Sequence, residues 1–146
     1  MSLISEIISI AQAAAPTATV ILTSKFNADY TAYCTAEAAL PLIVIDNQIE
    51  KSSEVKKNNN VQKDTKISIQ ILNLDSQDNT DSQSQSISDT CEDIADLIAV
   101  KIYQLTEVRP SGNQRYVVKP MYRILGSMMT GVTLDMQVNY NSIVNF

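Results

Sequence analysis

Apolar residues recur along this chain with two different periods, and each period predicts one kind of secondary structure. Between residues 86 and 105 the spacing is three and four residues, which is typical of an amphipathic helix. Between residues 131 and 140 apolar and polar residues alternate without a break, which predicts a strand with one buried face. The apolar stripe of the helix consists of Ile87, Cys91, Ile94, Leu97, Ile98, Ile102 and Leu105. We expect this helix to lie on one face of a sheet.

The N-terminal part of the chain predicts a short helix followed by a strand. Apolar residues at helical spacing favour a helix over residues 2–15, with Ser2 as its cap and Pro16 as its limit. Residues 17–24 are rich in β-branched side chains and predict a strand. Residues 26–40 fit either a helical turn or a loop with aromatic anchors.

Further strands are predicted on both sides of the long helix. Residues 42–46 are apolar on both faces, which is typical of a central strand. Residues 65–74 predict another strand, in which the apolar phase changes between Ile71 and Leu72. We expect a β-bulge or the end of the strand at that point. A strand region after the helix is interrupted by Pro120, which favours an edge position.

Between the strands at 42–46 and 65–74 the composition changes to polar. Residues 49–66 contain few apolar side chains and predict either a long exposed loop or a hairpin arm that leaves the body of the domain. The order of elements as a whole predicts an α+β fold in a single domain over residues 1–146. It combines a mostly antiparallel sheet, one long helix packed on a face, a short N-terminal helix and the polar arm.

The chain lacks most of the residues from which enzyme and metal sites are built. It contains no His and only three Gly, in no phosphate-binding pattern. The spacing of Asp75, Asp78 and Asp81 is not that of a calcium-binding EF-hand loop. An enzyme that relies on carboxylates such as Asp46 or Asp135 stays formally open, but nothing marks these residues as special. We therefore expect no catalytic residue, no metal and no cofactor.

The cysteines, the N-terminal stretch and the length of the apolar runs all bear on the cellular location of the protein. Cys34 and Cys91 lie far apart in sequence and are interpreted as small buried hydrophobic residues, although a disulfide stays open. The N-terminal stretch has no basic region and contains Glu6 within its apolar part, which argues against a secretory signal. No apolar run reaches the ~20 residues needed to cross a bilayer. We expect synthesis in the cytoplasm and no membrane partner.

Charged residues are separated by sign along the chain. The 11 Lys and Arg and 16 Asp and Glu give a net charge of −5, which argues against a nucleic-acid-coating role. Basic residues gather in two groups, of which one lies in the polar arm. The other comprises Arg109, Arg115, Lys119 and Arg123. The residues we expect at an interface between copies of the chain are Lys51, Lys56, Lys57, Lys63 and Lys66 in the arm, and Asp75, Asp78, Asp81, Asp89 and Glu92 before and within the helix. Complementary groups of this kind would suit head-to-tail association.

The order of elements resembles that of the tail-terminator (tail-completion) and neck proteins of tailed bacteriophages. Three segments carry the resemblance: Leu42 to Asp46 before the arm, Ile67 to Ile71 after it, and the closing Leu125 to Val138. The resemblance implies a structural virion protein that closes into a homomeric ring at the head–tail junction or the tail end. Its neighbours would be portal, adaptor, neck or tail-tube proteins, and DNA would pass its lumen without specific binding. The low glycine content departs from what this family leads us to expect.

Two alternatives to a ring-forming virion protein follow from the residues themselves. One is a small cytosolic module whose exposed sheet face or arm binds another protein without catalysis. The other is the carboxylate-dependent enzyme, which would need a pocket that gathers several acids. Size in solution distinguishes the first from the ring, because a monomer favours the module.

Overall fold

The structure is a computed structural model, and it describes residues 3–23, 40–46, 51–76, 78–105, 108–109, 115–123 and 128–143. The predicted cap Ser2 lies outside these residues, and so does the ambiguous segment 26–40 with Cys34, except for its last residue, Leu40. In chain order the elements are α1 (Leu3–Ala14), β1 (Thr19–Thr23), β2 (Leu42–Asp46), β3 (Lys51–Val55), β4 (Asn60–Leu74), α2 (Asp81–Tyr103), β5 (Val108–Arg109), β6 (Tyr116–Met121) and β7 (Met129–Ile143).

The strands form one sheet, and the fold is α+β as predicted. Its order is β1-β2-β4-β7-β5, with β3 also paired to β4 and β6 also paired to β7. Among the described strand pairs, β1–β2 is the parallel one and the others are antiparallel. The strand at 42–46 is central, as expected, because β2 lies between β1 and β4.

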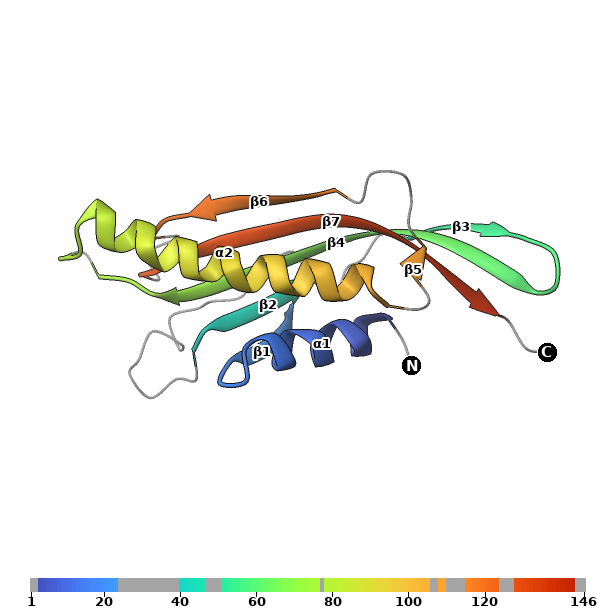
Figure 1. Cartoon of the computed structure of the whole chain (residues 1–146), viewed down its shortest axis with the longest axis horizontal. Helices are drawn as coiled ribbons and strands as arrows, with labels where there is room; N and C mark the ends of the chain where they lie inside the picture. Colours follow the sequence, from blue (N-terminus) through green and yellow to red (C-terminus); the bar gives the residue numbers. More distant parts are fainter. Residues whose placement is uncertain are drawn as a thin grey trace.

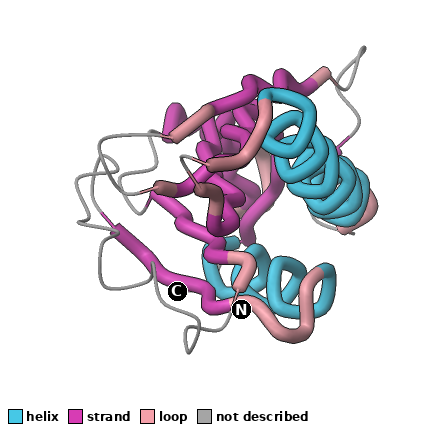
Figure 2. The backbone as a smooth tube through the Cα atoms, turned by 90° about the vertical axis from the view of Figure 1, so that its left-hand side faces the viewer, coloured by secondary structure: helices cyan, strands magenta, loops and turns pink. Residues whose placement is uncertain are grey.

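Both helices lie on the same side of the sheet (Figure 2). The longer helix, α2, runs along β4 and β7, and α1 packs beside it over β1 (Figure 1). The predicted alternation of β7 is confirmed, because its helix-facing residues are buried while the residues between them are at least partly exposed. These buried residues are Val132, Leu134, Met136, Val138 and Tyr140. They join the core formed with inward-facing isoleucines of β2 and β4.

The long helix begins earlier than its apolar stripe predicts. Thr80 caps it: the Thr80 hydroxyl accepts a hydrogen bond from the Gln83 backbone N–H, and the Gln83 side chain accepts one from the Thr80 N–H. Its first turns face the sheet with Ser84 and Ser88, which are buried although they are polar. Leu97 was predicted to lie on the sheet, and this is wrong, because the side chain is 42% exposed. The helix faces the core instead with Ala95, Ile98, Ala99 and Ile102, which are fully buried.

Strand β4 contains neither the bulge nor the strand end that we expected after Ile71. It pairs with β7 in one continuous register, from Asn60 opposite Ile143 to Leu74 opposite Met129. The apolar phase changes because both faces of the sheet are buried there. Ile71 belongs to the core under the helices, whereas Leu72 packs on the opposite face in a second cluster. This cluster contains Leu42, Val44, Leu72 and Met129.

Gly131 allows β7 to approach β4 at this second cluster. A Cβ atom on Gly131 would lie 1.9 Å from the carbonyl oxygen of Ile71, well inside any van der Waals contact. Glycine is therefore required by the close approach of the two backbones rather than by a turn.

The polar segment forms a hairpin arm, which confirms one of the two predicted alternatives for its described residues. Strand β3 pairs with the first residues of β4, and β7 continues along the other side of β4 to Ile143. This three-stranded arm extends beyond the body of the sheet (Figure 1). Its turn contains Asn58 and Asn59 at φ 64° and 61°, a left-handed conformation that asparagine tolerates better than most residues.

Candidate subunit-interface surfaces

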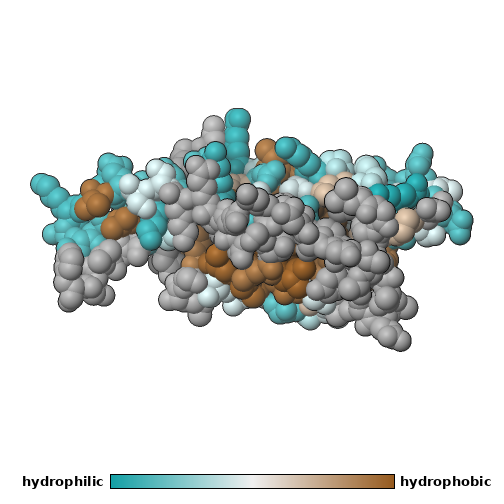
Figure 3. All heavy atoms as spheres, turned by 180° about the vertical axis from the view of Figure 1, so that it is seen from behind, coloured by the Kyte–Doolittle hydropathy of each residue, from teal (hydrophilic) through white to brown (hydrophobic). Residues whose placement is uncertain are grey.

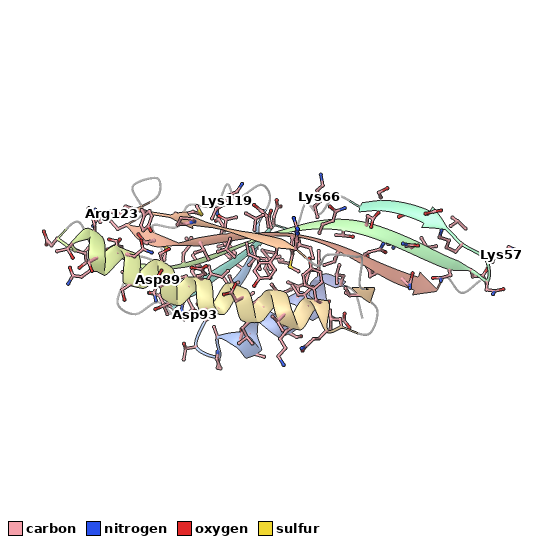
Figure 4. All side chains as sticks on the ribbon, turned by 45° about the horizontal axis from the view of Figure 1, so that its top comes forward. Lys57, Lys66, Asp89, Asp93, Lys119 and Arg123 are labelled. Carbon is pink, nitrogen blue, oxygen red and sulfur yellow. The ribbon has the colours of Figure 1, made fainter. Side chains whose placement is uncertain are left out.

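The lysines predicted for the interface follow the arm from its base to its end. Lys57 lies exposed at the turn, and Lys66 lies exposed where the arm joins the body (Figure 4). Lys51 is placed in β3 opposite Thr65 through its backbone, and its side chain lies outside the described part. The described lysines therefore place positive charge at both ends of the arm, with the exposed acids Glu54 and Asp64 between them.

Two arm lysines have contacts within the arm itself. Lys56 Nζ lies 2.9 Å from Glu54 Oε1, in an exposed ion pair. Lys63 Nζ lies 5.9 Å from the ring centre of Tyr140 on the neighbouring β7, in cation–π range. The exposed ion pair contributes little to stability. Lys56 is exposed, whereas Lys63 is partly buried.

Four of the five predicted acids are exposed at the opposite part of the molecule. Asp78 precedes α2, Asp81 is its first residue, and Asp89 and Glu92 follow on its surface. Asp89 and Asp93 lie on α2, in the body of the molecule, whereas Lys57 lies at the far end of the arm (Figure 4). The two predicted charge groups are thus separated along the long axis of one subunit.

Asp75 differs from the other predicted acids, because its side chain is fully buried. Its Oδ1 atom accepts hydrogen bonds of 2.7 Å from the Ser76 backbone N–H and the Asn79 amide. Its Oδ2 atom accepts hydrogen bonds from the Ser84 hydroxyl at 2.7 Å and the Thr130 hydroxyl at 2.6 Å. These bonds join the segment before α2, the first turn of α2 and strand β7.

The hydrogen bonds keep this buried carboxyl group ionised. Burial by itself raises the pKa of Asp75, but the bonds from Thr130, Ser84, Asn79 and Ser76 outweigh burial and hold the pKa well below its usual range. Arg123 adds positive charge, with its Nε atom 3.5 Å from Asp75 Oδ2. Asp75 therefore stabilises the fold from inside and does not belong to an exposed acidic surface, which corrects its place in the predicted set.

The second basic group is dispersed rather than gathered on one surface. Arg123 faces inward, where its guanidinium donates hydrogen bonds to the Asn79 carbonyl oxygen at 2.8 Å and to the Ser84 hydroxyl at 3.1 Å. Lys119 lies on the outer face of β6, 4.0 Å from Asp135. Arg115 is exposed, and the side chain of Arg109 lies outside the described part.

Two tyrosines attach α2 to the strands beside it. The Tyr103 hydroxyl lies 3.0 Å from the carbonyl oxygens of both Arg115 and Gln137. The Tyr116 hydroxyl donates a hydrogen bond of 2.8 Å to the carboxylate of Asp96, which raises the pKa of Tyr116. Burial raises the pKa of Tyr103. Both phenols therefore stay protonated hydrogen-bond donors at neutral pH.

The face of the sheet opposite the helices is largely polar along its centre. Cross-strand pairs between β4 and β7 place Gln62 opposite Asn141, Asp64 opposite Asn139 and Lys66 opposite Gln137. Figure 3 shows this face, with hydrophilic side chains along its upper part and an apolar area lower down, where β1 and β2 lie in Figure 1. The helix-free side of the sheet thus carries a polar band that runs from the body into the arm.

Two hollows in the described part of the surface are lined by polar and charged side chains, and the second, of about 340 Å³, includes Lys66, Arg115 and Asp135. One hollow of about 370 Å³ is lined by Asp81, Ser84, Gln85, Tyr122 and Arg123. The Tyr122 hydroxyl donates a hydrogen bond of 2.8 Å to Gln85, and Arg123 is already bound to its neighbours.

In the described parts of the chain, no three His, Cys, Asp or Glu residues are grouped so that they could hold a metal ion. No described helix is long and apolar enough to cross a membrane.

Cys91 behaves as the small buried hydrophobic residue that the sequence predicts. Only 1% of it is exposed, in the core between α2 and the sheet. Burial raises the pKa of its thiol to about 12. The thiol therefore stays protonated and unreactive at neutral pH.

Sequence reasoning missed three exposed aliphatic side chains that lie close to the predicted charges. Val55 in the arm is 80% exposed, and Leu97 and Val100 on α2 are 42% and 45% exposed. Leu97 also lines a hollow of about 120 Å³ with Ile10, Ala13, Ala14 and Lys101. Two of the three had a signal in the sequence: Val55 is an isolated apolar residue in a polar segment, and Val100 falls outside the apolar stripe of its helix. Leu97 had none, because it belongs to that stripe.

A comparison of the chain with models of known protein families and with curated protein sequences finds no match. The function is therefore inferred from the geometry of this chain itself.

Proposed function

We propose that this chain is a structural subunit that assembles head to tail with copies of itself into a ring, in the neck or at the tail end of a tailed bacteriophage. The observation that carries the proposal is the arm, which projects beyond the body with lysines while exposed acids lie along α2. A projecting surface and its complement elsewhere on the same subunit form a heterologous contact. Such a contact closes into a ring when the rotation between subunits allows it.

The proposed role is mechanical. A ring of this kind caps or joins the tail and leaves a passage for DNA, next to portal, adaptor, neck or tail-tube proteins. The net charge of −5 supports a passage that DNA crosses without adhering to it, because phosphate binding requires concentrated positive charge. This role requires no catalytic residue, cofactor or membrane, and it places the protein in the virion after synthesis in the host cytoplasm.

The decisive experiment is the mass of the purified chain by light scattering, together with negative-stain imaging, at low and high salt. We expect a ring that dissociates as salt rises, because salt screens contacts between exposed charges. The double variant Lys57→Gln/Lys66→Gln should weaken the ring. Arg115→Gln/Lys119→Gln removes the same amount of charge outside the arm and serves as the control.

A chain that stays monomeric at every concentration and salt tested would contradict self-assembly and favour the protein-binding module instead. A ring whose stability is the same in both double variants would show that charge on the arm does not hold it together.

A further inference from the structure

The end of the arm combines one exposed aliphatic side chain with positive charge. We call residues 54–57 the arm tip. Val55 is 80% exposed there, and the two following residues, Lys56 and Lys57, are exposed lysines. Its single acid is Glu54. An isolated exposed valine needs no explanation by itself, but one at the end of a projecting arm is available to a partner.

One side of α2 combines the same kind of apolar residue with the opposite charge. Asp89, Asp93, Leu97 and Val100 follow at intervals of four, four and three residues, so they share one side of the helix. We call these four exposed residues the α2 ridge. Beside it lies the apolar hollow of about 120 Å³ that Leu97 shares with α1. The basic residue at this hollow is Lys101.

The two surfaces are complementary in three respects. An aliphatic knob, Val55, corresponds to an aliphatic patch with a hollow. The lysines of the tip correspond to the aspartates of the ridge. The minority charges are opposite as well, because the tip carries Glu54, which pairs with Lys56 in the free subunit, and the hollow carries Lys101. Charge complementarity around a central apolar contact is the usual arrangement of a specific interface.

The arm tip does not reach the α2 ridge of its own subunit. Strands β4 and β7 pair without a break into the arm, and they carry the tip away from the body and its helices (Figures 1 and 4). A contact between this tip and this ridge therefore requires a second copy of the chain. We infer that the arm tip of one copy docks on the α2 ridge of the next, with Val55 as its apolar anchor. This inference rests on the proposed self-assembly.

Engineered cysteines test the contact directly in the full-length chain. In a Cys34→Ser background, the variant Val55→Cys/Val100→Cys should form disulfides between copies under mild oxidation, seen as a ladder on a non-reducing gel. Disulfides require Cα atoms within about 7 Å, so the ladder reports a specific approach. The control Val117→Cys/Val100→Cys places the first cysteine on β6, where Val117 is 51% exposed, and should give no ladder.

Weakened association is the second readout. Val55→Ser should raise the dissociation constant of self-association roughly tenfold, because an anchoring valine loses its burial. The control Val117→Ser should leave it unchanged. Lys57→Glu and Asp93→Lys should each weaken association, and the two together should restore it.

The outcomes separate the docking contact from the proposed function. A cross-linked ladder and charge-swap rescue support the contact. Oligomers that form equally well in Val55→Ser and show no Val55–Val100 cross-link overturn the docking contact and leave ring formation standing. A wild-type chain that never self-associates, together with a Val55→Cys/Val100→Cys variant that gives no ladder, overturns both.

Discussion

Removal of the buried carboxylate in Asp75→Ala should lower the free energy of unfolding by about 3–5 kcal/mol. The substitution leaves the Ser84 and Thr130 hydroxyls, the Asn79 amide and the Ser76 N–H without their acceptor, and the first two residues are buried. It also removes the acid beside Arg123. A domain of ordinary stability has only about 5–15 kcal/mol in total. The variant should therefore lose a large share of its stability.

The loss of unfolding free energy in Asp75→Ala should come from the lost hydrogen bonds rather than from the smaller side chain. Asp75→Asn keeps the shape and one acceptor oxygen, and hydroxyl groups can rotate to accept from the new amide. We expect a loss of about 1–2 kcal/mol for this variant. Asp78→Ala, at an exposed position three residues later, is the matched control and should change stability by less than about 0.5 kcal/mol.

Urea denaturation followed by circular dichroism measures these differences as shifts of the midpoint at constant slope. Equal stability of Asp75→Ala and Asp78→Ala would refute the reasoning, because the hydrogen-bonded carboxylate would then contribute nothing. Increased amide exchange confined to the first turns of α2 in Asp75→Ala would instead show that the network holds mainly the start of that helix.

The same carboxylate predicts a pH dependence. Its pKa in the folded state is held below the value of about 3.9 expected in the unfolded chain. Its contribution is therefore complete above about pH 4, and it is lost as the pH falls further toward the folded pKa. Asp75→Asn should show a shallower loss of stability with acid than the wild type. Identical acid profiles for the two proteins would contradict this assignment.

Three further predictions concern the core and the attachment of α2. Gly131→Ala should cost about 3 kcal/mol or more in urea unfolding, because its Cβ would lie 1.9 Å from the Ile71 carbonyl oxygen; the exposed Gln137→Ala on the same strand should cost little. Cys91, in a Cys34→Ser background, should react with a thiol reagent at pH 8 only after unfolding, because its pKa is raised to about 12; fast reaction of the native protein would contradict its burial. Tyr103→Phe should cost about 1 kcal/mol by removing the single O–H donor that lies between two carbonyl oxygens, and more than Tyr122→Phe, whose side chain is 45% exposed.

The sequence predicted best those elements that have one buried face and one exposed face, because the two faces then differ in hydrophobicity. Strand β7 has one buried and one partly exposed face over most of its length, so its alternation identified both the strand and its inward residues. The apolar stripe of α2 predicted the helix and its contact with the sheet. It did not indicate the first turn, which contains no apolar residue. Serines face the sheet there, and a polar residue is buried only where the fold supplies partners.

Two features could not be predicted from the local sequence, because they depend on contacts with distant parts of the chain. These are the continuous pairing of β4 and the burial of Asp75. The phase change in β4 suggested a bulge, since the sequence does not show that both faces of the sheet are buried at Leu72. Asp75 was taken for a surface acid, since one of its partners, Thr130, is 55 residues away. Composition left a long loop and a hairpin arm as alternatives, and strand pairing decides for the arm. The exposed Leu97 on α2 became apparent only from the packing of that helix.

Two of the three strands of the arm, β4 and β7, are the longest described strands and continue into the body of the sheet. They share fifteen consecutive residue pairs, which begin at the outer end of the arm and end under the start of α2. A pull on the end of the arm along the strands would load this ladder in shear, where many hydrogen bonds resist together, rather than open them one at a time. The arm should therefore behave as a stiff lever, and tension applied at its end should reach the core within the same two strands.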